Sequence, residues 1–129
     1  MSVIADHMSR ELLQASPDEP LAEAARHMVG RGVGAVLVMD GDRLEGILTE
    51  RDILKAVAVG LTEESRVRDW LTKNPETIDA SDTTEHAAAL MIHGGFRHLP
   101  VLDGGAVVGI VSIRDLMRVT LDDSAPRGV

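Results

Sequence analysis

One segment of the chain occurs twice. Residues 46–52, Gly-Ile-Leu-Thr-Glu-Arg-Asp, return 63 positions later at 109–115 as Gly-Ile-Val-Ser-Ile-Arg-Asp. With the same shift and no gap, residues 4–54 match residues 67–117. Such self-similarity indicates duplication of one structural unit. A unit of about 60 residues buries little surface alone, whereas two units share one core. We therefore expect one compact domain with pseudo-twofold symmetry.

The repeat also predicts how the chain is divided. We expect a first repeat over residues 1–60, a linker over 61–66 and a second repeat over 67–121. Residues 122–129 contain Asp, Pro and Gly without apolar periodicity, so we expect a frayed tail there.

Composition narrows the class of protein. With 44% apolar and 26% charged residues, the chain is typical of a soluble globular domain, and one Trp and one Phe leave an aliphatic core. The absence of cysteine excludes disulfides and thiolate sites. No apolar leader precedes the repeats, and no apolar run approaches the roughly 20 residues that span a bilayer. A net charge of −8 disfavours nucleic acid. We expect a cytoplasmic protein with neither a nucleic-acid nor a membrane partner.

Each repeat predicts the same order of elements after a short lead-in at 4–8 or 67–71: strand, helix, strand, strand, helix. The Ala-rich helix has apolar residues at helical spacing, and Asp-Gly turns join the two apolar runs that follow it. The fold class is therefore α+β, with two tandem β-α-β-β-α repeats packed as a pseudo-twofold pair. The expected ranges are 13–16, 20–30, 35–39, 44–48 and 50–59 in the first repeat, and 77–80, 83–93 and 114–121 for the first strand and the two helices of the second.

Two motifs, Thr49-x-x-Asp52 and Ser112-x-x-Asp115, stand where a strand passes into a helix. A hydroxyl residue followed three positions later by an acid is typical of a capping box, in which both side chains bond free backbone amides. A cap of this kind contributes about 1 kcal/mol and needs no ligand. This interpretation remains open for both motifs.

A second interpretation assigns the same motifs to a ligand. The N-terminus of a helix attracts anions, so a hydroxyl there can donate to a phosphate. A carboxylate one turn along can accept the hydroxyls of a ribose. The preceding Gly46 and Gly109 allow another group to approach the backbone closely. Together these residues favour a nucleoside phosphate.

The chain resembles a tandem pair of cystathionine-β-synthase (CBS) domains, the regulatory Bateman module, in its stand-alone prokaryotic form. The resemblance covers residues 4–121. It rests on the Ala-rich helices that end in Met28 and Met91, the Leu-Pro-Val-Leu-Asp-Gly segment at 99–104, and the two Gly-h-h-[Ser/Thr]-x-x-Asp motifs, where h is apolar. Each motif alone is weak evidence for the family, but the motifs together, in this order and in duplicate, are specific to it.

The resemblance implies two clefts that accept an adenosyl ligand such as AMP, ADP, ATP, NAD or S-adenosylmethionine, sensing energy or redox state. Asp52 and Asp115 would hold ribose hydroxyls, and Thr49 and Ser112 would face phosphate. The residues implied around adenine are Ala15, Ser16, Ile78 and Ala80, with apolar walls from Val36, Leu37, Leu99 and Pro100. It also implies a homodimer through the final helices and an unidentified protein target.

The two repeats differ in charge. Arg97 and His98 precede the second Leu-Pro strand, whereas Gly34 and Ala35 occupy these positions in the first repeat. In the family a basic pair here commonly reaches ligand phosphates, which implies unequal affinities at the two sites. The alternative is that both residues are solvated at the start of an edge strand, where Pro100 is tolerated.

Arg51 and Arg114 hold matching positions inside the motifs. We expect them either to reach phosphate or to pair with acids across the pseudo-twofold axis, and ion pairing is the favoured interpretation. The histidines lack metal-ligand spacing, and no Gly-x-Ser-x-Gly segment occurs. We therefore expect no metal, no catalytic cofactor and no enzymatic activity. The alternative function is a ligand-free interaction scaffold in which both motifs are only helix caps.

Overall fold

The computed structural model describes residues 2–124, with side chains up to residue 121. Its contacts divide the chain into two compact units. One is Leu12–Pro75, called here the Asp52 unit. The other, the Asp115 unit, combines the described residues up to Glu11 with those from Glu76 onward. Each unit contains one of the two repeated motifs.

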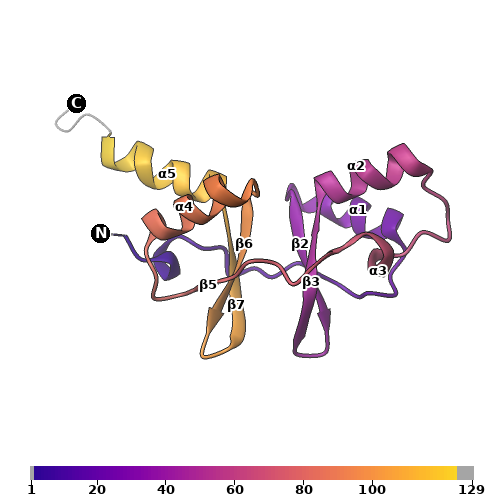
Figure 1. The fold of residues 1–129 in the computed structure, drawn as a ribbon, viewed down its shortest axis with the longest axis horizontal. Coiled ribbons are helices and arrows are strands. Elements are labelled where there is room, and N and C mark those ends of the chain that lie inside the picture. Colours follow the sequence, from indigo (N-terminus) through magenta and orange to yellow (C-terminus); the bar gives the residue numbers. More distant parts are fainter. Residues whose placement is uncertain (1, 125–129) are drawn as a thin grey trace. The chain divides into compact units, whose positions relative to one another are not determined.

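The Asp52 unit contains a four-stranded sheet in the order β1-β2-β3-β4 (Figure 1). Strand β1 pairs parallel with β2, and the other neighbours are antiparallel. The elements are β1 (Gln14–Ala15), α1 (Leu21–Arg31), β2 (Ala35–Asp40), β3 (Arg43–Thr49), α2 (Glu50–Val59), α3 (Val67–Trp70) and β4 (Thr72–Lys73).

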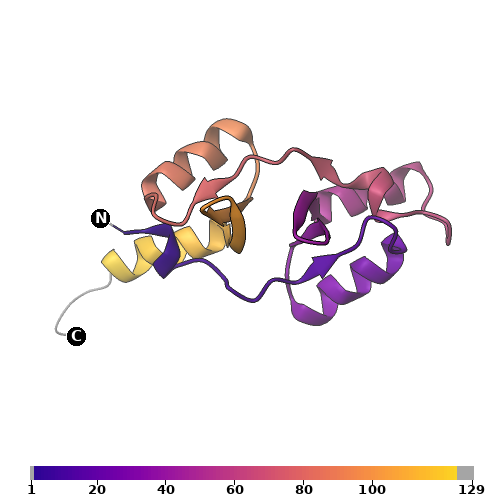
Figure 2. The same ribbon diagram turned by 90° about the horizontal axis from the view of Figure 1, so that it is seen from below.

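The Asp115 unit repeats this plan with a three-stranded sheet in the order β5-β6-β7 (Figure 2). Its elements are a 3-10 turn η1 (Ile4–Asp6), β5 (Ile78–Asp79), α4 (Thr84–Gly94), β6 (His98–Asp103), β7 (Ala106–Ser112) and α5 (Ile113–Ser124). The predicted α+β class and the order strand, helix, strand, strand, helix are confirmed in both repeats. Helix α5 continues three residues beyond 121, and the remaining part of the predicted tail, 125–129, lies outside the described residues.

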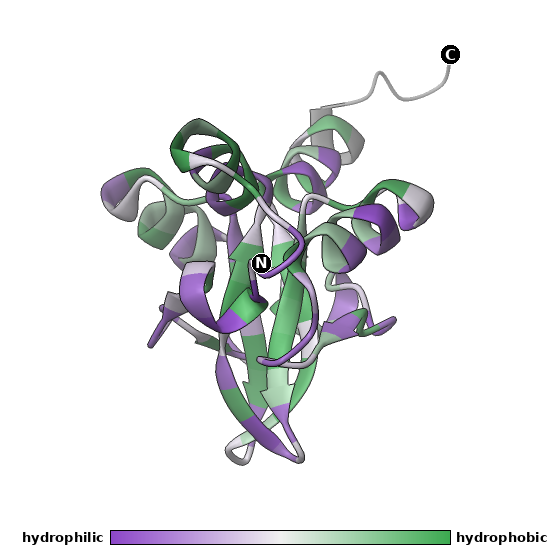
Figure 3. Cartoon of the chain, turned by 90° about the vertical axis from the view of Figure 1, so that its right-hand side faces the viewer, coloured by the Kyte–Doolittle hydropathy of each residue, from purple (hydrophilic) through white to green (hydrophobic). Residues whose placement is uncertain are grey.

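Each unit has its own core, so the expectation that the two repeats share one core is wrong, whereas the aliphatic character predicted from composition is confirmed. Hydrophobic residues follow the strands, hydrophilic residues gather toward the hairpin ends, and the helices carry residues of both kinds (Figure 3). Trp70 is half-buried and packs against the core of the Asp52 unit. The buried core residues are Ala15, Leu21, Ala24, Met28, Val36, Val38, Leu48, Ala56 and Val67 in the Asp52 unit, and Ile4, Ile78, Ala80, Ala87, Met91, Leu99, Val101, Val111 and Leu116 in the Asp115 unit.

The lead-in segments are exchanged between the repeats. Ile4 begins the first repeat but is fully buried in the core of the Asp115 unit, and its amide donates to the Asp82 carbonyl at 2.8 Å. Val67 begins the second repeat but is fully buried in the Asp52 unit, where its amide donates to the Glu19 carbonyl at 3.0 Å. Each compact unit is therefore built from parts of both sequence repeats.

Strand β6 is the central strand of its sheet and not an edge strand, but β5 pairs only with Val101 and Leu102. From His98 to Pro100, β6 therefore pairs with β7 alone among the described strands, and Pro100 is tolerated there. Its counterpart Leu37 donates its amide to the Leu13 carbonyl at 3.2 Å, and a proline has no amide hydrogen to do so. Strand β5 accordingly pairs with β6 only from Val101 onward, beyond the proline.

Candidate functional site

Thr49 and Asp52 form a complete capping box at the start of α2. Oδ2 of Asp52 accepts from the Thr49 amide at 2.9 Å and from its hydroxyl at 3.0 Å. The Asp52 amide donates to Thr49 Oγ1 at 3.2 Å. The structural interpretation of the first motif is therefore confirmed, and the cap occupies only one of the two carboxylate oxygens.

Ser112 and Asp115 have the same geometry at the start of α5. Oδ2 of Asp115 accepts from the Ser112 amide at 2.8 Å and from its hydroxyl at 3.0 Å, and the Asp115 amide donates to Ser112 Oγ at 3.2 Å. Oδ1 has a contact of 3.5 Å with the Arg118 guanidinium, whose side chain is 66% exposed. This long, solvated contact leaves Oδ1 of Asp115 with most of its acceptor capacity.

A third side chain joins the first motif. The hydroxyl of Thr72, on β4, lies 3.2 Å from Oδ1 and 3.3 Å from Oδ2 of Asp52. Thr72 pairs with Ile47, and its counterpart Ser9 pairs with Ile110 in the same way. Sequence reasoning missed Thr72, although Ser9 and Thr72 are 63 positions apart and both carry a hydroxyl, which is the signal that could have found them.

Gly46 and Gly109 admit the exchanged lead-in segments. A Cβ at Gly46 would lie 2.3 Å from the Thr72 carbonyl oxygen, and one at Gly109 would lie 2.7 Å from the Ser9 carbonyl oxygen. Any side chain there would displace the backbone of the neighbouring segment. The close approach predicted at these glycines thus exists, and the approaching group is the protein's own backbone.

Several residues expected around adenine contribute their side chains to the cores. Ala15 and Val36 lie in the core of the Asp52 unit, and Ile78, Ala80 and Leu99 lie in the core of the Asp115 unit.

The remaining observations on the residues expected around adenine concern backbone hydrogen bonds, strand faces and exposure. Ala80 also donates its amide to Leu102 at 2.8 Å and accepts from the Ala5 amide at 2.9 Å. Leu37 and Pro100 lie on the opposite faces of their strands from Val36 and Leu99. Ser16 is exposed.

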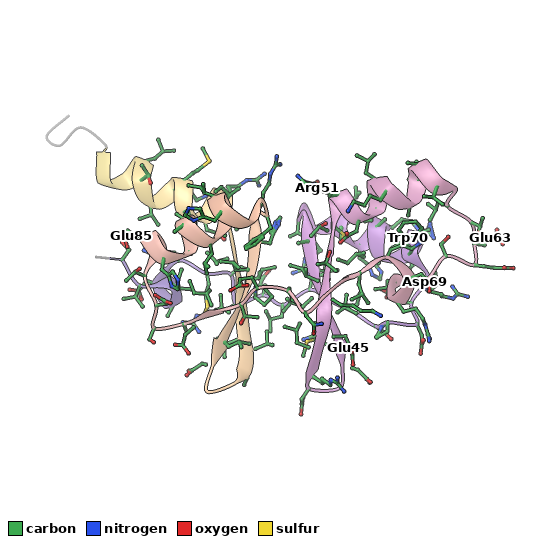
Figure 4. All side chains as sticks on the ribbon, viewed as in Figure 1. Glu45, Arg51, Glu63, Asp69, Trp70 and Glu85 are labelled. Atoms are coloured by element: carbon green, nitrogen blue, oxygen red, sulfur yellow. The ribbon has the colours of Figure 1, made fainter. Side chains whose placement is uncertain are left out.

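The arginines of the motifs have no acidic partner within the described part of their own unit. Arg51 lies exposed at the start of α2 (Figure 4), and Arg114 holds the matching exposed position in α5. Neither forms an ion pair within the described part of its unit, so the structure gives no support there to the ion-pair interpretation. Both guanidinium groups are available to an anion.

Arg97 and His98 lie beside the second motif. The Arg97 carbonyl accepts from the amide of Ile113, the first residue of α5, at 2.9 Å. His98 is half-buried and is the register partner of Ser112. The structure therefore brings Arg97, His98, Ser112, Arg114 and Asp115 together at one end of the β6-β7 pair. In the Asp52 unit, the matching amide bond runs from Glu50 to the Gly34 carbonyl at 3.0 Å.

Three acidic residues outside the motifs, Glu19, Asp79 and Asp82, have a shifted pKa. Hydrogen bonds from His86 and the Thr83 amide lower the pKa of Asp82 at the start of α4. Burial raises the pKa of Glu19 despite the opposing charge of His27, and Glu19 Oε2 is buried without a hydrogen-bond partner. Among residues 2–124, no cluster of His, Cys, Asp and Glu is suited to a metal ion, and no helix is long and apolar enough to cross a membrane.

Comparison with known proteins gives the family. The sequence model of the CBS domain matches residues 4–59 and 67–122. The chain therefore belongs to the CBS domain family and carries two copies of the domain.

Two curated relatives illustrate the range of lengths. An uncharacterized 17.7 kDa protein of Acidianus ambivalens is 41% identical over 108 residues, which cover 82% of this chain and 65% of the relative. The CBS domain-containing protein YhcV of Bacillus subtilis is 33% identical over 117 residues, covering 90% of this chain and 84% of the relative. The chain thus spans just under two thirds of the Acidianus protein's length.

Solved structures share the fold over nearly the whole chain. A putative signal-transduction protein with CBS domains from Burkholderia ambifaria has a TM-score of 0.86 at 34% identity, covering 93% of this chain and 90% of its own. CBSX2 in complex with AMP has a TM-score of 0.82 at 26% identity, with 95% and 98% covered. The CBS pair of MJ0100, bound to 5′-methylthioadenosine and S-adenosyl-L-methionine, has a TM-score of 0.87 at 26% identity, again with 95% and 98% covered.

Proposed function

We propose that the chain is a non-catalytic regulatory module that binds an adenosyl ligand, such as AMP, ADP, ATP, NAD or S-adenosylmethionine, at its two motifs and signals occupancy to a protein partner. In each unit the carboxylate of the motif accepts ribose hydroxyls, and the hydroxyl and arginine of the motif face the 5′ substituent. The ligands bound by CBSX2 and by the CBS pair of MJ0100 share the adenosyl group, which supports this ligand class.

One observation carries the proposal: the caps use one oxygen of each carboxylate. Oδ2 of Asp52 and of Asp115 completes the cap, while Oδ1 of each lies outside it. A carboxylate offers about four acceptor positions, so a capping carboxylate retains capacity for a ribose hydroxyl. Capping and ligand binding are therefore compatible in the same residue.

Regulation follows from differential affinity. A ligand that binds one conformation of a CBS pair more tightly shifts the population toward it, and a partner that recognises this conformation responds. Present at 100 times its dissociation constant, a ligand that binds only that conformation stabilises it by about 2.7 kcal/mol relative to the other. This free energy is sufficient to change the occupancy of a signalling state by about two orders of magnitude.

The module acts as a homodimer in this proposal, because both repeats expose apolar residues at matched positions. Leu54 on α2 is 68% exposed and its counterpart Met117 on α5 is 58% exposed. Val29 on α1 and Ile92 on α4 are also matched, at 82% and 75% exposed. Large apolar side chains kept in water at corresponding positions of all four long helices favour a protein interface.

The test is thermal unfolding of the protein with AMP, ADP, ATP, NAD, S-adenosylmethionine and 5′-methylthioadenosine. We expect at least one ligand to raise the melting temperature, and Asp52→Asn or Asp115→Asn to reduce the increase. Asp103→Asn, at an exposed hairpin turn, is the matched control and should leave it unchanged. If no ligand raises the melting temperature and both variants lose only about a capping energy of 1 kcal/mol, the motifs are caps of an interaction scaffold.

A further inference from the structure

The two motifs differ in charge where they otherwise match. The residue between hydroxyl and arginine is Glu50 in the Asp52 unit and Ile113 in the Asp115 unit. Glu50 is exposed in the first turn of α2, next to the exposed Arg51. The start of α2 at the first motif therefore carries one exposed carboxylate for its one exposed guanidinium, before Asp52 itself is counted.

The second motif has the opposite balance. The exposed Arg97 is anchored beside the motif through its carbonyl bond to the Ile113 amide, and Arg114 extends from the first turn of α5. Neither guanidinium has an acidic partner among the described residues of the Asp115 unit. Gly34, which replaces Arg97 in the first motif, supplies no charge at all.

The ribose-binding carboxylates differ as well. Asp52 is buried, and the Thr72 hydroxyl bonds its Oδ1, whereas Asp115 is half-buried and its Oδ1 has, among the described residues, the long Arg118 contact alone. A ligand at Asp52 must share or displace the Thr72 hydroxyl. At Asp115 no described hydroxyl outside the cap has to be displaced in this way.

We infer that the two motifs bind adenosyl ligands of different charge. The Asp115 motif takes a nucleoside phosphate, whose anion Arg97 and Arg114 neutralise. The Asp52 motif takes an adenosyl compound without a phosphate, and Glu50 is the specificity-determining residue that repels phosphate there. The inference rests on the proposed function, since it assigns a ligand class to each of its two sites.

The experiment compares AMP with adenosine, which differ by the phosphate alone, using isothermal titration of the wild type, Asp52→Asn and Asp115→Asn. We expect one tight AMP site per chain, which Asp115→Asn removes and Asp52→Asn leaves intact. We expect adenosine binding at the first motif, which Asp52→Asn removes. Two AMP sites of equal affinity, or AMP binding that depends on Asp52, would overturn the inference while leaving the proposed function in place.

Exchanging the residue between hydroxyl and arginine tests the cause. Glu50→Ile copies the second motif and should strengthen AMP binding at the first site on the order of 3- to 10-fold, since one repulsive charge is removed at short range. Ile113→Glu should weaken AMP binding at the second site by a similar factor, and neither change should alter adenosine binding.

The matched control is Glu63→Gln, at an exposed position of the same unit far from Arg51 (Figure 4). An equal gain from this control would assign the effect to net charge and overturn the role of Glu50. If neither AMP nor adenosine binds any variant, the proposed function and this inference both fail.

Discussion

Thr72 and Asp52 are separated by 20 residues in the sequence, yet the Thr72 hydroxyl donates to Asp52 Oδ1 at 3.2 Å. This bond joins the exchanged lead-in of the second repeat to the motif of the first. The counterpart Ser9 pairs with β7 through its backbone and has no side-chain bond to Asp115 in the described structure. The duplication thus produced two similar sites with different surroundings.

Replacing Thr72 by valine should destabilise the protein. The change leaves an oxygen of the buried Asp52 carboxylate without this donor, which costs about 1–3 kcal/mol. Urea unfolding of Thr72→Val measures the loss, and Ser9→Ala is the matched control, with an expected change within about 0.5 kcal/mol. A loss in the control as large as that in Thr72→Val would show that the hydroxyl bond is not the cause.

Gly46 should not tolerate alanine. A Cβ there would lie 2.3 Å from the Thr72 carbonyl oxygen, so Gly46→Ala must push β4 away from β3 and should cost about 1–3 kcal/mol or more. Gly30→Ala is the control, because no atom lies within 4 Å of its added Cβ and the residue is inside α1. There alanine should stabilise the protein by up to about 1 kcal/mol. Thermal unfolding measures the change in melting temperature of both variants. Equal changes in Gly46→Ala and Gly30→Ala would contradict the close approach of the Thr72 carbonyl to Gly46.

Glu19 should make the protein less stable as the pH rises. Burial raises the pKa of the Glu19 carboxyl in the folded state above the unfolded value near 4.5. The contribution of this group to the free energy of unfolding is therefore complete below pH 4.5 and is lost as the pH rises through the folded pKa. Glu19→Gln should remove this dependence and be more stable than the wild type at neutral pH. Urea unfolding between pH 4 and pH 8 measures it, with the exposed Glu23→Gln as control. A wild type and Glu19→Gln with parallel pH profiles would refute the effect.

Asp82 should make the protein less stable as the pH falls, which is opposite to the effect of Glu19. His86 and the Thr83 amide bond its carboxylate and lower its pKa below the ordinary 3.8. Its contribution is therefore complete above about pH 4 and is lost as the pH falls through the lowered value. The stability difference between the wild type and Asp82→Asn should shrink in acid unfolding curves recorded below pH 4. A difference that stays constant down to pH 2 would argue against the bonded carboxylate.

The elements of both repeats could be predicted from sequence because their signals are local. The left-handed Gly32 and Gly95 end α1 and α4 close to the predicted positions, and both hairpins form at the predicted Asp-Gly turns. The capping geometry of both motifs was also predictable, since each spans four residues.

Features that depend on contacts distant in sequence could not be predicted. The exchange of the lead-ins, the bond from Thr72 and the central position of β6 arise only when separate segments meet. A 63-residue period is equally compatible with a segment that packs in its own repeat and one that packs in the other, because the sequence match is the same in both cases. Which of the two occurs depends on packing between distant segments. In the sequence, the one sign of this packing is the glycine at positions 46 and 109, where a side chain would not fit.

The exchange of lead-ins determines which fragments of this chain are complete. A fragment cut at residue 60 would lack α3 and β4, and would carry an η1 segment whose core is missing. During synthesis, the Asp52 unit is complete once Pro75 has been added, because the unit is one continuous segment. The Asp115 unit is split in sequence, so η1 acquires its final neighbours only after the whole Asp52 unit and the later elements of its own unit have been synthesised.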